Sequence, residues 1–139
     1  MNRLLSDRRL LVVEDEMLIL MMIEDMLGEL GCTSVTTAAT NEQAIRLIEG
    51  QSFDAAMLDM NLNGQKSQRV ADALVNHGVP FIFSTGNSSH DTWDGYAHHV
   101  VIRKPFLFNE LVAALTQLLR APREDDTSVK TLSLGFNRT

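Results

Sequence analysis

The sequence predicts an α/β fold in which helices cover both faces of a parallel sheet. Short apolar runs of strand length alternate along the chain with longer segments of helical periodicity. Such alternation builds right-handed crossovers between parallel strands, which gives a doubly wound sheet. The chain of 139 residues is also long enough to bury the core of one such domain.

Five segments are predicted to form the strands of this sheet. They are residues 10–13, 34–38, 53–58, 81–85 and 100–103. The first is wholly apolar, as is typical of a strand that is buried on both faces, and the third suits the centre of the sheet. Pro80 opens the fourth strand, where its missing N–H group is tolerated.

Four segments have helical periodicity. They are residues 17–30, 41–50, 67–77 and 109–120. Gly31 and Gly78 follow the first and third segments as favoured left-handed stops, and Thr40 with Gln43 forms a capping box before the second. Residues 86–99 are rich in poor helix formers, so we expect a short helix or a mobile, solvated loop before the last strand.

Polar side chains stand at the ends of four of these strands. They are Glu14 and Asp15, Asp59, Thr85 and Lys104. The carboxyl ends of parallel strands lie along one edge of a sheet, where folds of this class bind their ligands. We therefore expect three carboxylates, a hydroxyl and an ammonium group to converge at that edge.

Such a cluster favours phosphoryl transfer with a bound metal ion. Carboxylates about 4 Å apart repel each other by roughly 1 to 4 kcal/mol per pair, and a divalent cation relieves this repulsion. Oxygen ligands favour Mg²⁺, or Mn²⁺, which is often bound by carboxylates together with a phosphate. Asp59 would be the nucleophile that forms an acyl phosphate, while Lys104 and Thr85 would bind the transferred oxygens.

Each of these residues taken alone has a simpler interpretation. Aspartates at strand ends are ordinary turn formers and helix caps, and Lys104 before Pro105 could be a solvated strand end. Four motifs in order, each closing an apolar run, favour the functional interpretation. A phosphate-cradling cofactor site is disfavoured by the acidic run at residues 14–16, and an aspartyl-phosphate hydrolase by Asn61, which cannot donate a carboxyl proton.

Over residues 9–120 the chain resembles the receiver domain of response regulators, the phosphoacceptor module of two-component signalling. The resemblance rests on the acidic pair Glu14-Asp15, on Asp59 in Leu58-Asp59-Met60-Asn61-Leu62-Asn63-Gly64, on Thr85 and on Lys104-Pro105-Phe106. It implies a flavodoxin-like, CheY-like five-stranded sheet with strand order 2-1-3-4-5. It also implies that Asp59 is the phosphoacceptor, and that Glu14, Asp15, Asp59 and the backbone carbonyl of Asn61 hold the metal.

The same resemblance implies a stand-alone cytoplasmic response regulator in a phosphorelay. Its phosphoryl group would come from a sensor histidine kinase or a phosphotransfer protein, and its output would be contact with a downstream protein, as a monomer or weak homodimer. It would not be an enzyme beyond slow self-dephosphorylation. The alternative is a degenerate receiver that binds partners independently of phosphorylation, against which the intact Asp59, Thr85 and Lys104 argue.

Two features depart from the common receiver pattern. Val101 stands where most receivers carry a switching Tyr or Phe, so the loop at residues 86–99, which includes Trp93, is expected to switch instead. The run Phe83-Ser84-Thr85-Gly86 resembles a subgroup of receivers with Phe-Ala-Thr-Gly-X-Tyr, which the next two residues do not complete. In the same loop, the adjacent His98 and His99 would point to opposite sides of an extended chain and so do not suggest a metal site.

Composition and chain ends set further expectations. The net charge of −6, without a basic stripe, argues against nucleic-acid binding. The longest apolar run, residues 17–23, is well short of the ~20 residues that cross a membrane. Cys32 is expected to be a small buried hydrophobe. Residues 1–8 are expected to form an N-terminal extension and residues 121–139 a flexible tail, too short for an output domain.

Overall fold

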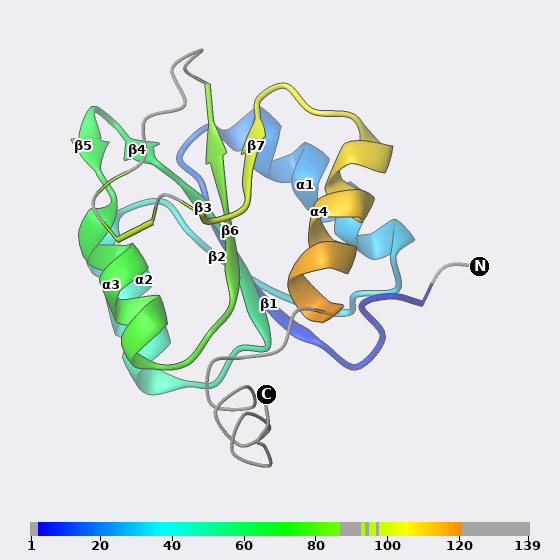
Figure 1. Cartoon of the computed structure of the whole chain (residues 1–139), viewed down its shortest axis with the longest axis horizontal. Helices are drawn as coiled ribbons and strands as arrows, with labels where there is room; N and C mark the ends of the chain where they lie inside the picture. The colour runs from blue at the N-terminus through cyan, green and yellow to red at the C-terminus, as the bar shows by residue number, and fades with distance from the viewer. Residues whose placement is uncertain (1–2, 87–92, 94, 97, 121–139) are drawn as a thin grey trace.

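A parallel five-stranded sheet forms the centre of the molecule (Figure 1). The computed structural model describes residues 3–86, 93, 95–96 and 98–120. The strands are β1 (Arg9–Val13), β2 (Ser34–Ala38), β3 (Ala55–Asp59), β6 (Phe81–Thr85) and β7 (Val101–Arg103), in the spatial order β2-β1-β3-β6-β7. The numbers β4 (Asn61–Leu62) and β5 (Gln65–Lys66) belong to a separate two-stranded hairpin, so they are skipped in the main sheet. The predicted strand order 2-1-3-4-5 is therefore confirmed.

Helices cover both faces of this sheet. They are α1 (Met17–Glu29), α2 (Asn41–Gly50), α3 (Gln68–Asn76) and α4 (Phe108–Arg120). Figure 1 shows α2 and α3 on one face and α1 and α4 on the other. Among the described residues, no helix is both long enough and apolar enough to cross a bilayer.

Alternation along the strands divides the core into two layers. In β1, Leu11 and Val13 pack towards α2 and α3, whereas Leu10 and Val12 pack towards α1 and α4. All four are buried, since successive side chains of a strand point to opposite faces and both faces carry helices. This burial explains why the first strand reads as a continuous apolar run.

The helix ends follow their predicted chemistry. Gly31 and Gly78 have φ values of 90° and 69°, the left-handed conformation expected after α1 and α3. Thr40 caps α2 by accepting a hydrogen bond of 3.1 Å from the N–H group of Gln43. The side chain of Gln43 reaches back to the N–H group of Ala39 at 2.8 Å, one residue earlier than in the usual capping box.

Leu5 ties the amino-terminal residues to the domain. Its side chain is fully buried among the residues that pack towards α1 and α4, and its N–H group donates to the carbonyl of Leu30 at 2.9 Å. Cys32 is buried in the same layer, as predicted.

Between β6 and β7, Trp93, Tyr96 and His99 form an aromatic cluster with Phe81 and Phe83, and the described residues of this segment include no helix. Tyr96 is buried and donates a hydrogen bond of 2.8 Å to Asp72 of α3. The ring of His99 lies 4.1 Å from that of Phe81 and its Nε2 atom lies 2.7 Å from the Phe81 carbonyl oxygen. The expectation of a solvated loop is wrong for Tyr96 and His99, because Phe81 and Phe83 on β6 need apolar cover here, whereas Gly95 and His98 are exposed. The rest of that expectation, at residues 87–92, 94 and 97, lies outside the described residues.

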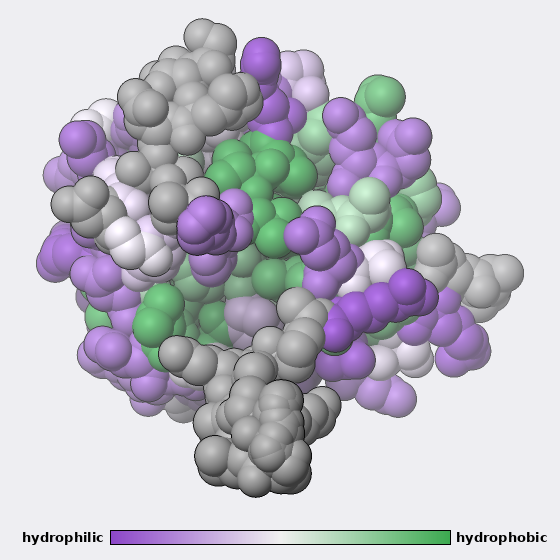
Figure 2. Space-filling view, viewed as in Figure 1, coloured by the Kyte–Doolittle hydropathy of each residue, from purple (hydrophilic) through white to green (hydrophobic). Residues whose placement is uncertain are grey.

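The edge strand β7 is only partly covered. Val101 and Ile102 are half-buried. Figure 2 shows hydrophobic residues reaching the surface in the middle of this face, with polar residues around them. Since β7 pairs with β6 alone, its outer edge has no strand neighbour in the described part of the chain.

Candidate functional site

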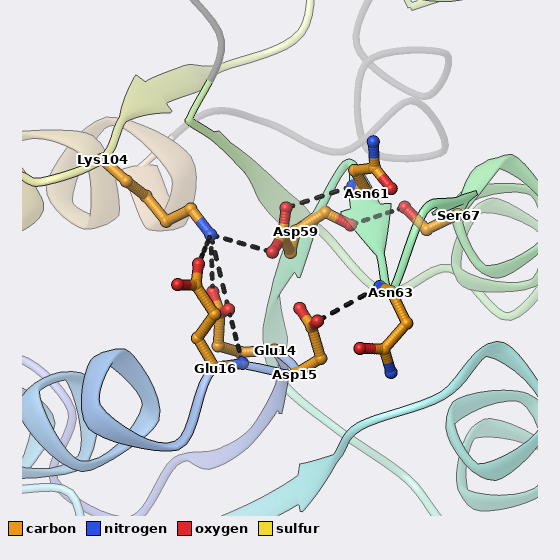
Figure 3. A network of polar contacts seen from close by, with 8 residues as sticks. All are labelled: Glu14, Asp15, Glu16, Asp59, Asn61, Asn63, Ser67 and Lys104. Carbon is orange, nitrogen blue, oxygen red and sulfur yellow. Dashed lines mark hydrogen bonds and ion pairs between the residues drawn. The ribbon is translucent and has the colours of Figure 1, made fainter.

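Three carboxylates meet at the carboxyl edge of the sheet (Figure 3). Glu14 and Asp15 follow β1, and Asp59 is the last residue of β3. These strands are neighbours whose register pairs Val13 with Leu58, so the residues after them emerge side by side. One carboxylate oxygen from each of the three acids lies within 4.8 Å of the others. The predicted convergence of the acidic residues is thus present.

Lys104 reaches this acidic group from β7, two strands away from β3. Its Nζ atom donates to Oδ2 of Asp59 at 2.9 Å and to Oε1 of Glu14 at 3.2 Å. The side chains of Lys104, Asp59 and Glu14 are 7%, 5% and 1% exposed. The ion pairs therefore lie where solvent screens them little.

Burial and charge shift the pKa values of this cluster. Burial, with the nearby charge of Asp59 as the next cause, raises the pKa of Glu14 to about 7 from its ordinary 4.5. Burial alone would lower the pKa of Lys104. The hydrogen bond and charge of Asp59, followed by those of Glu14, outweigh burial and raise it. The lysine therefore stays charged, while Glu14 exchanges protons near neutral pH.

Thr85 lies at the end of β6, between the strands that carry Asp59 and Lys104. It is buried, and its carbonyl oxygen accepts a hydrogen bond of 2.7 Å from the N–H group of Lys104. The strand order thus places the predicted switch hydroxyl at the same edge of the sheet as the acids. Its role towards a phosphoryl group remains a prediction.

Asn61 is placed beside the acids by its own backbone. Its N–H group donates to Oδ1 of Asp59 at 3.1 Å. It begins the β4–β5 hairpin, which sequence reasoning missed. The Asn63-Gly64 pair between two short strands was the available indication, because this dipeptide favours a two-residue hairpin turn. The part of the Asn61 carbonyl in metal binding stays a prediction.

Glu16 lies at the site, although sequence reasoning did not assign it there. Its Oε1 atom lies 3.3 Å from Nζ of Lys104, and its side chain is 60% exposed. Its backbone N–H group also donates to Oε2 of Glu14 at 3.1 Å. The acidic run Glu14-Asp15-Glu16 was a visible signal, but the sequence did not show which of the three acids face the lysine.

The donor set of this site fits a hard divalent cation. All three acidic ligands offer oxygen, and their mutual distances allow one ion to touch all of them. Lys104 supplies one positive charge against the carboxylates of Glu14, Asp15 and Asp59, so the cluster keeps an excess of negative charge when all are ionised. A nucleophilic carboxylate with an adjacent ammonium group is also suited to accepting a phosphoryl group.

Comparison with known proteins gives a family match over most of the chain. The family model of the response regulator receiver domain matches residues 10–116. The two-component response regulator PhoP of Pseudomonas aeruginosa is 32% identical over 117 residues, which cover 81% of this chain and 52% of PhoP. The chain spans about half the length of the curated relatives it matches.

Solved structures give matches of nearly full length. The solution structure of SdrG from Sphingomonas melonis is 41% identical with a TM-score of 0.73, covering 84% of this chain and 98% of SdrG. SdrG is also known in a BeF3-activated conformation. The receiver domain of the sensor histidine kinase PA1611 from Pseudomonas aeruginosa is 27% identical with a TM-score of 0.69, covering 84% of this chain and all of that domain. That structure has a magnesium ion coordinated in its active-site cleft.

Proposed function

The chain belongs to the response regulator receiver domain family, and from this premise we propose that it is a stand-alone phosphoacceptor of a two-component phosphorelay. In this proposal, Asp59 takes a phosphoryl group from a histidine kinase or a phosphotransfer protein. The protein then signals by binding a downstream protein. It is a phosphoacceptor with at most slow self-dephosphorylation and has no further enzymatic activity.

One observation carries this proposal. A carboxylate oxygen of Asp59 lies within 4.8 Å of one from each of Glu14 and Asp15, and its Oδ2 atom lies 2.9 Å from the buried ammonium group of Lys104. A carboxylate that served only as a turn former would need neither the acids nor the lysine. Removing a lone carboxylate from water is costly, so a buried acid with charged neighbours indicates a site selected for chemistry.

The transfer itself is a displacement at phosphorus. A carboxylate oxygen of Asp59 attacks the phosphorus of a phosphohistidine, the new O–P bond forms as the P–N bond breaks, and the electron pair stays on the imidazole nitrogen. Lys104, already beside Asp59, holds its positive charge against the transferred oxygens. Thr85, at the same edge, then donates a hydrogen bond to one of those oxygens.

Mg²⁺ is the cofactor of the proposed reaction, with Mn²⁺ as a substitute. Glu14, Asp15, Asp59 and the backbone carbonyl of Asn61 would hold it. When bound, the ion would neutralise charge that develops on the phosphoryl oxygens. Support comes from the all-oxygen donor set of the three acids and from the magnesium ion in the related PA1611 receiver domain.

Mass spectrometry after incubation with acetyl phosphate and MgCl2 tests the proposal. The wild-type chain should gain one phosphoryl mass, and Asp59→Asn should gain none. Asp54→Asn is the matched control, because Asp54 stands before the other end of β3, where it accepts a hydrogen bond from the N–H group of Arg9. Labelling of Asp59→Asn would contradict the site, and an unlabelled wild-type chain would favour a degenerate receiver that binds partners without phosphorylation.

A further inference from the structure

The β4–β5 hairpin brings a backbone N–H group to the acidic site from outside the main sheet. The N–H group of Asn63 donates to Oδ2 of Asp15 at 3.1 Å, across 48 positions of sequence. Figure 3 shows the backbone nitrogen of Asn63 facing Asp15 from the tip of the hairpin, with the other Asp15 oxygen on the side of Asp59. One oxygen of Asp15 is therefore held by the hairpin, and the second remains for a cation.

A tight turn determines where this N–H group points. Asn63 and Gly64 have φ values of 52° and 82°, and positive values at both central residues are what a type I′ turn requires. Asparagine and glycine tolerate this conformation best, whereas a β-branched residue strongly disfavours it. A Cβ atom added at Gly64 would meet nothing within 4 Å, so it would act through backbone conformation and not through a clash.

Both legs of the hairpin are fixed to the domain. Ser67, fully buried directly after β5, donates from Oγ to the carbonyl oxygen of Asp59 at 2.6 Å and so ties the end of the hairpin to the end of β3. At the same end of the hairpin, the buried Asn41 of α2 donates from Nδ2 to the carbonyl oxygen of Lys66 at 3.1 Å. With the legs held in this way, the turn residues decide whether the tip meets Asp15.

We propose that the Asn63-Gly64 turn is a positioning element for Asp15 as a metal ligand, an inference that rests on the proposed function. Asp15 is the least buried of the three acids, so its side chain has the most freedom to leave the site. The hydrogen bond from Asn63 holds one orientation of the carboxylate before the ion arrives. Groups that orient a ligand in this way typically change metal affinity when they are removed.

Calorimetric titration of the full chain with MgCl2 tests this role without any phosphorylation step. Gly64→Val should weaken Mg²⁺ binding by about tenfold, in the range typical for groups that orient a metal ligand. Gly78→Val is the matched control. Gly78 also has positive φ, 69°, and room for a Cβ atom, but it follows α3 and makes no contact with the acids. The control should bind Mg²⁺ as the wild type does.

Two further variants separate positioning from general destabilisation. Asn63→Val should weaken binding as Gly64→Val does, whereas Asn63→Gly keeps both the N–H group and the positive φ and should bind normally. In an Asp15→Asn background, Gly64→Val should have no additional effect, because the carboxylate it positions is gone.

The outcomes distinguish this inference from the proposed function. Failure of the wild type to bind Mg²⁺ would remove the metal site itself. If the wild type binds Mg²⁺ and Asp15→Asn weakens this binding but Gly64→Val does not, only the role of the turn would be overturned. Equal losses in Gly64→Val and Gly78→Val would also overturn it, since the effect would then follow stability and not the hairpin.

Discussion

The ammonium nitrogen of Lys104 lies 2.9 Å from Oδ2 of Asp59 and 3.2 Å from Oε1 of Glu14, so one buried cation serves two buried acids. Each acid would be costly to keep ionised without it. Because Lys104 comes from β7 and the acids from β1 and β3, the same contacts hold three strand ends together. We therefore expect both the stability of the fold and the proposed phosphoryl transfer to depend on this one side chain.

Lys104→Gln should lower the free energy of unfolding by about 3 kcal/mol in EDTA, because removing one partner leaves buried carboxylates without a counter-charge. Urea denaturation at neutral pH measures this difference. Mg²⁺ should restore part of the loss, since it supplies positive charge to the same acids. Lys66→Gln, at an exposed position, is the control and should change little. Equal stability of Lys104→Gln and the wild type would show that the lysine does not stabilise the resting site.

The pKa of Glu14 gives a pH dependence with a defined sign. In the folded chain this pKa is about 7, against 4.5 for the ordinary carboxyl group, so the folded state binds the proton more tightly. Proton binding by Glu14 therefore stabilises the folded state fully below pH 4.5, and this stabilisation is lost as the pH rises to about 7. In EDTA, Glu14→Gln should thus gain in melting temperature relative to the wild type as pH rises through this interval.

Saturating Mg²⁺ should reverse that order at high pH, because the ion stabilises the wild type by binding only the folded site and Glu14→Gln has lost a ligand. Differential scanning fluorimetry with and without the ion, at several pH values, gives both comparisons. A melting-temperature difference in EDTA that is independent of pH would show that Glu14 does not take up a proton near neutrality.

The main sheet and the central site residues were predictable from the sequence for a physical reason. A strand buried on both faces must be apolar along its whole length, so the residues that end each run stand out. Glu14, Asp15, Asp59 and Lys104 stand at such ends, and the structure brings them together. The strand order came from the resemblance to receivers, because nothing in the strands themselves specifies their neighbours.

The features missed from the sequence depend on tertiary contacts. Glu16 adjoins Lys104 only because β7 returns to the same edge of the sheet as β1, which no local pattern encodes. Likewise, His99 lies in a run that reads as polar, yet it packs on Phe81 because β6 presents aromatic side chains there. The β4–β5 hairpin is different, because its Asn63-Gly64 turn could have been predicted from the sequence and was overlooked.

Glu16→Gln should speed phosphorylation by acetyl phosphate by a few-fold at low salt. Glu16 places an exposed carboxylate 3.3 Å from Lys104, where it competes with incoming phosphoryl oxygens and repels them. About 1 kcal/mol of relief corresponds to roughly a fivefold change in rate. Stability should change little, because ion pairs with an exposed partner are weak. Mass spectrometry over time gives the rate, with Glu24→Gln, exposed on the helix α1 that follows Glu16, as the control. Equal rates for Glu16→Gln and the wild type would show that this carboxylate does not oppose the phosphodonor.

Tyr96→Phe should lower the free energy of unfolding by about 1 to 2 kcal/mol, because it removes a hydrogen bond to a carboxylate. The bond in question joins Tyr96 to Asp72 of α3 at 2.8 Å. Tyr96→Ala should cost more, since the ring also packs edge to face on Phe83 with centroids 5.5 Å apart. Chemical denaturation measures both. If Tyr96→Phe had the same free energy of unfolding as the wild type, water would satisfy Asp72 as well as the tyrosine does.

Beryllofluoride with Mg²⁺, standing in for the phosphoryl group on Asp59, should change the fluorescence of Trp93. Trp93 is the single tryptophan of the chain, and its ring packs edge to face on Phe83 with centroids 5.3 Å apart. Phe83 precedes Thr85 by two residues on β6, so both side chains project from the same face of the strand. A movement of Thr85 towards the new oxygens would therefore reach Phe83 through one short strand segment.

Thr85→Ala separates this movement from binding of the mimic. The variant should still accept a phosphoryl group on Asp59, because the acids and Lys104 are intact, but its Trp93 emission should no longer respond to beryllofluoride. Phe83→Leu should also weaken the response while leaving phosphorylation unchanged, since it removes the ring on which Trp93 packs. Identical Trp93 emission of the wild type with and without beryllofluoride, under conditions where Asp59 is shown to be occupied, would exclude the aromatic cluster as the route. The switching surface would then have to be sought on α4.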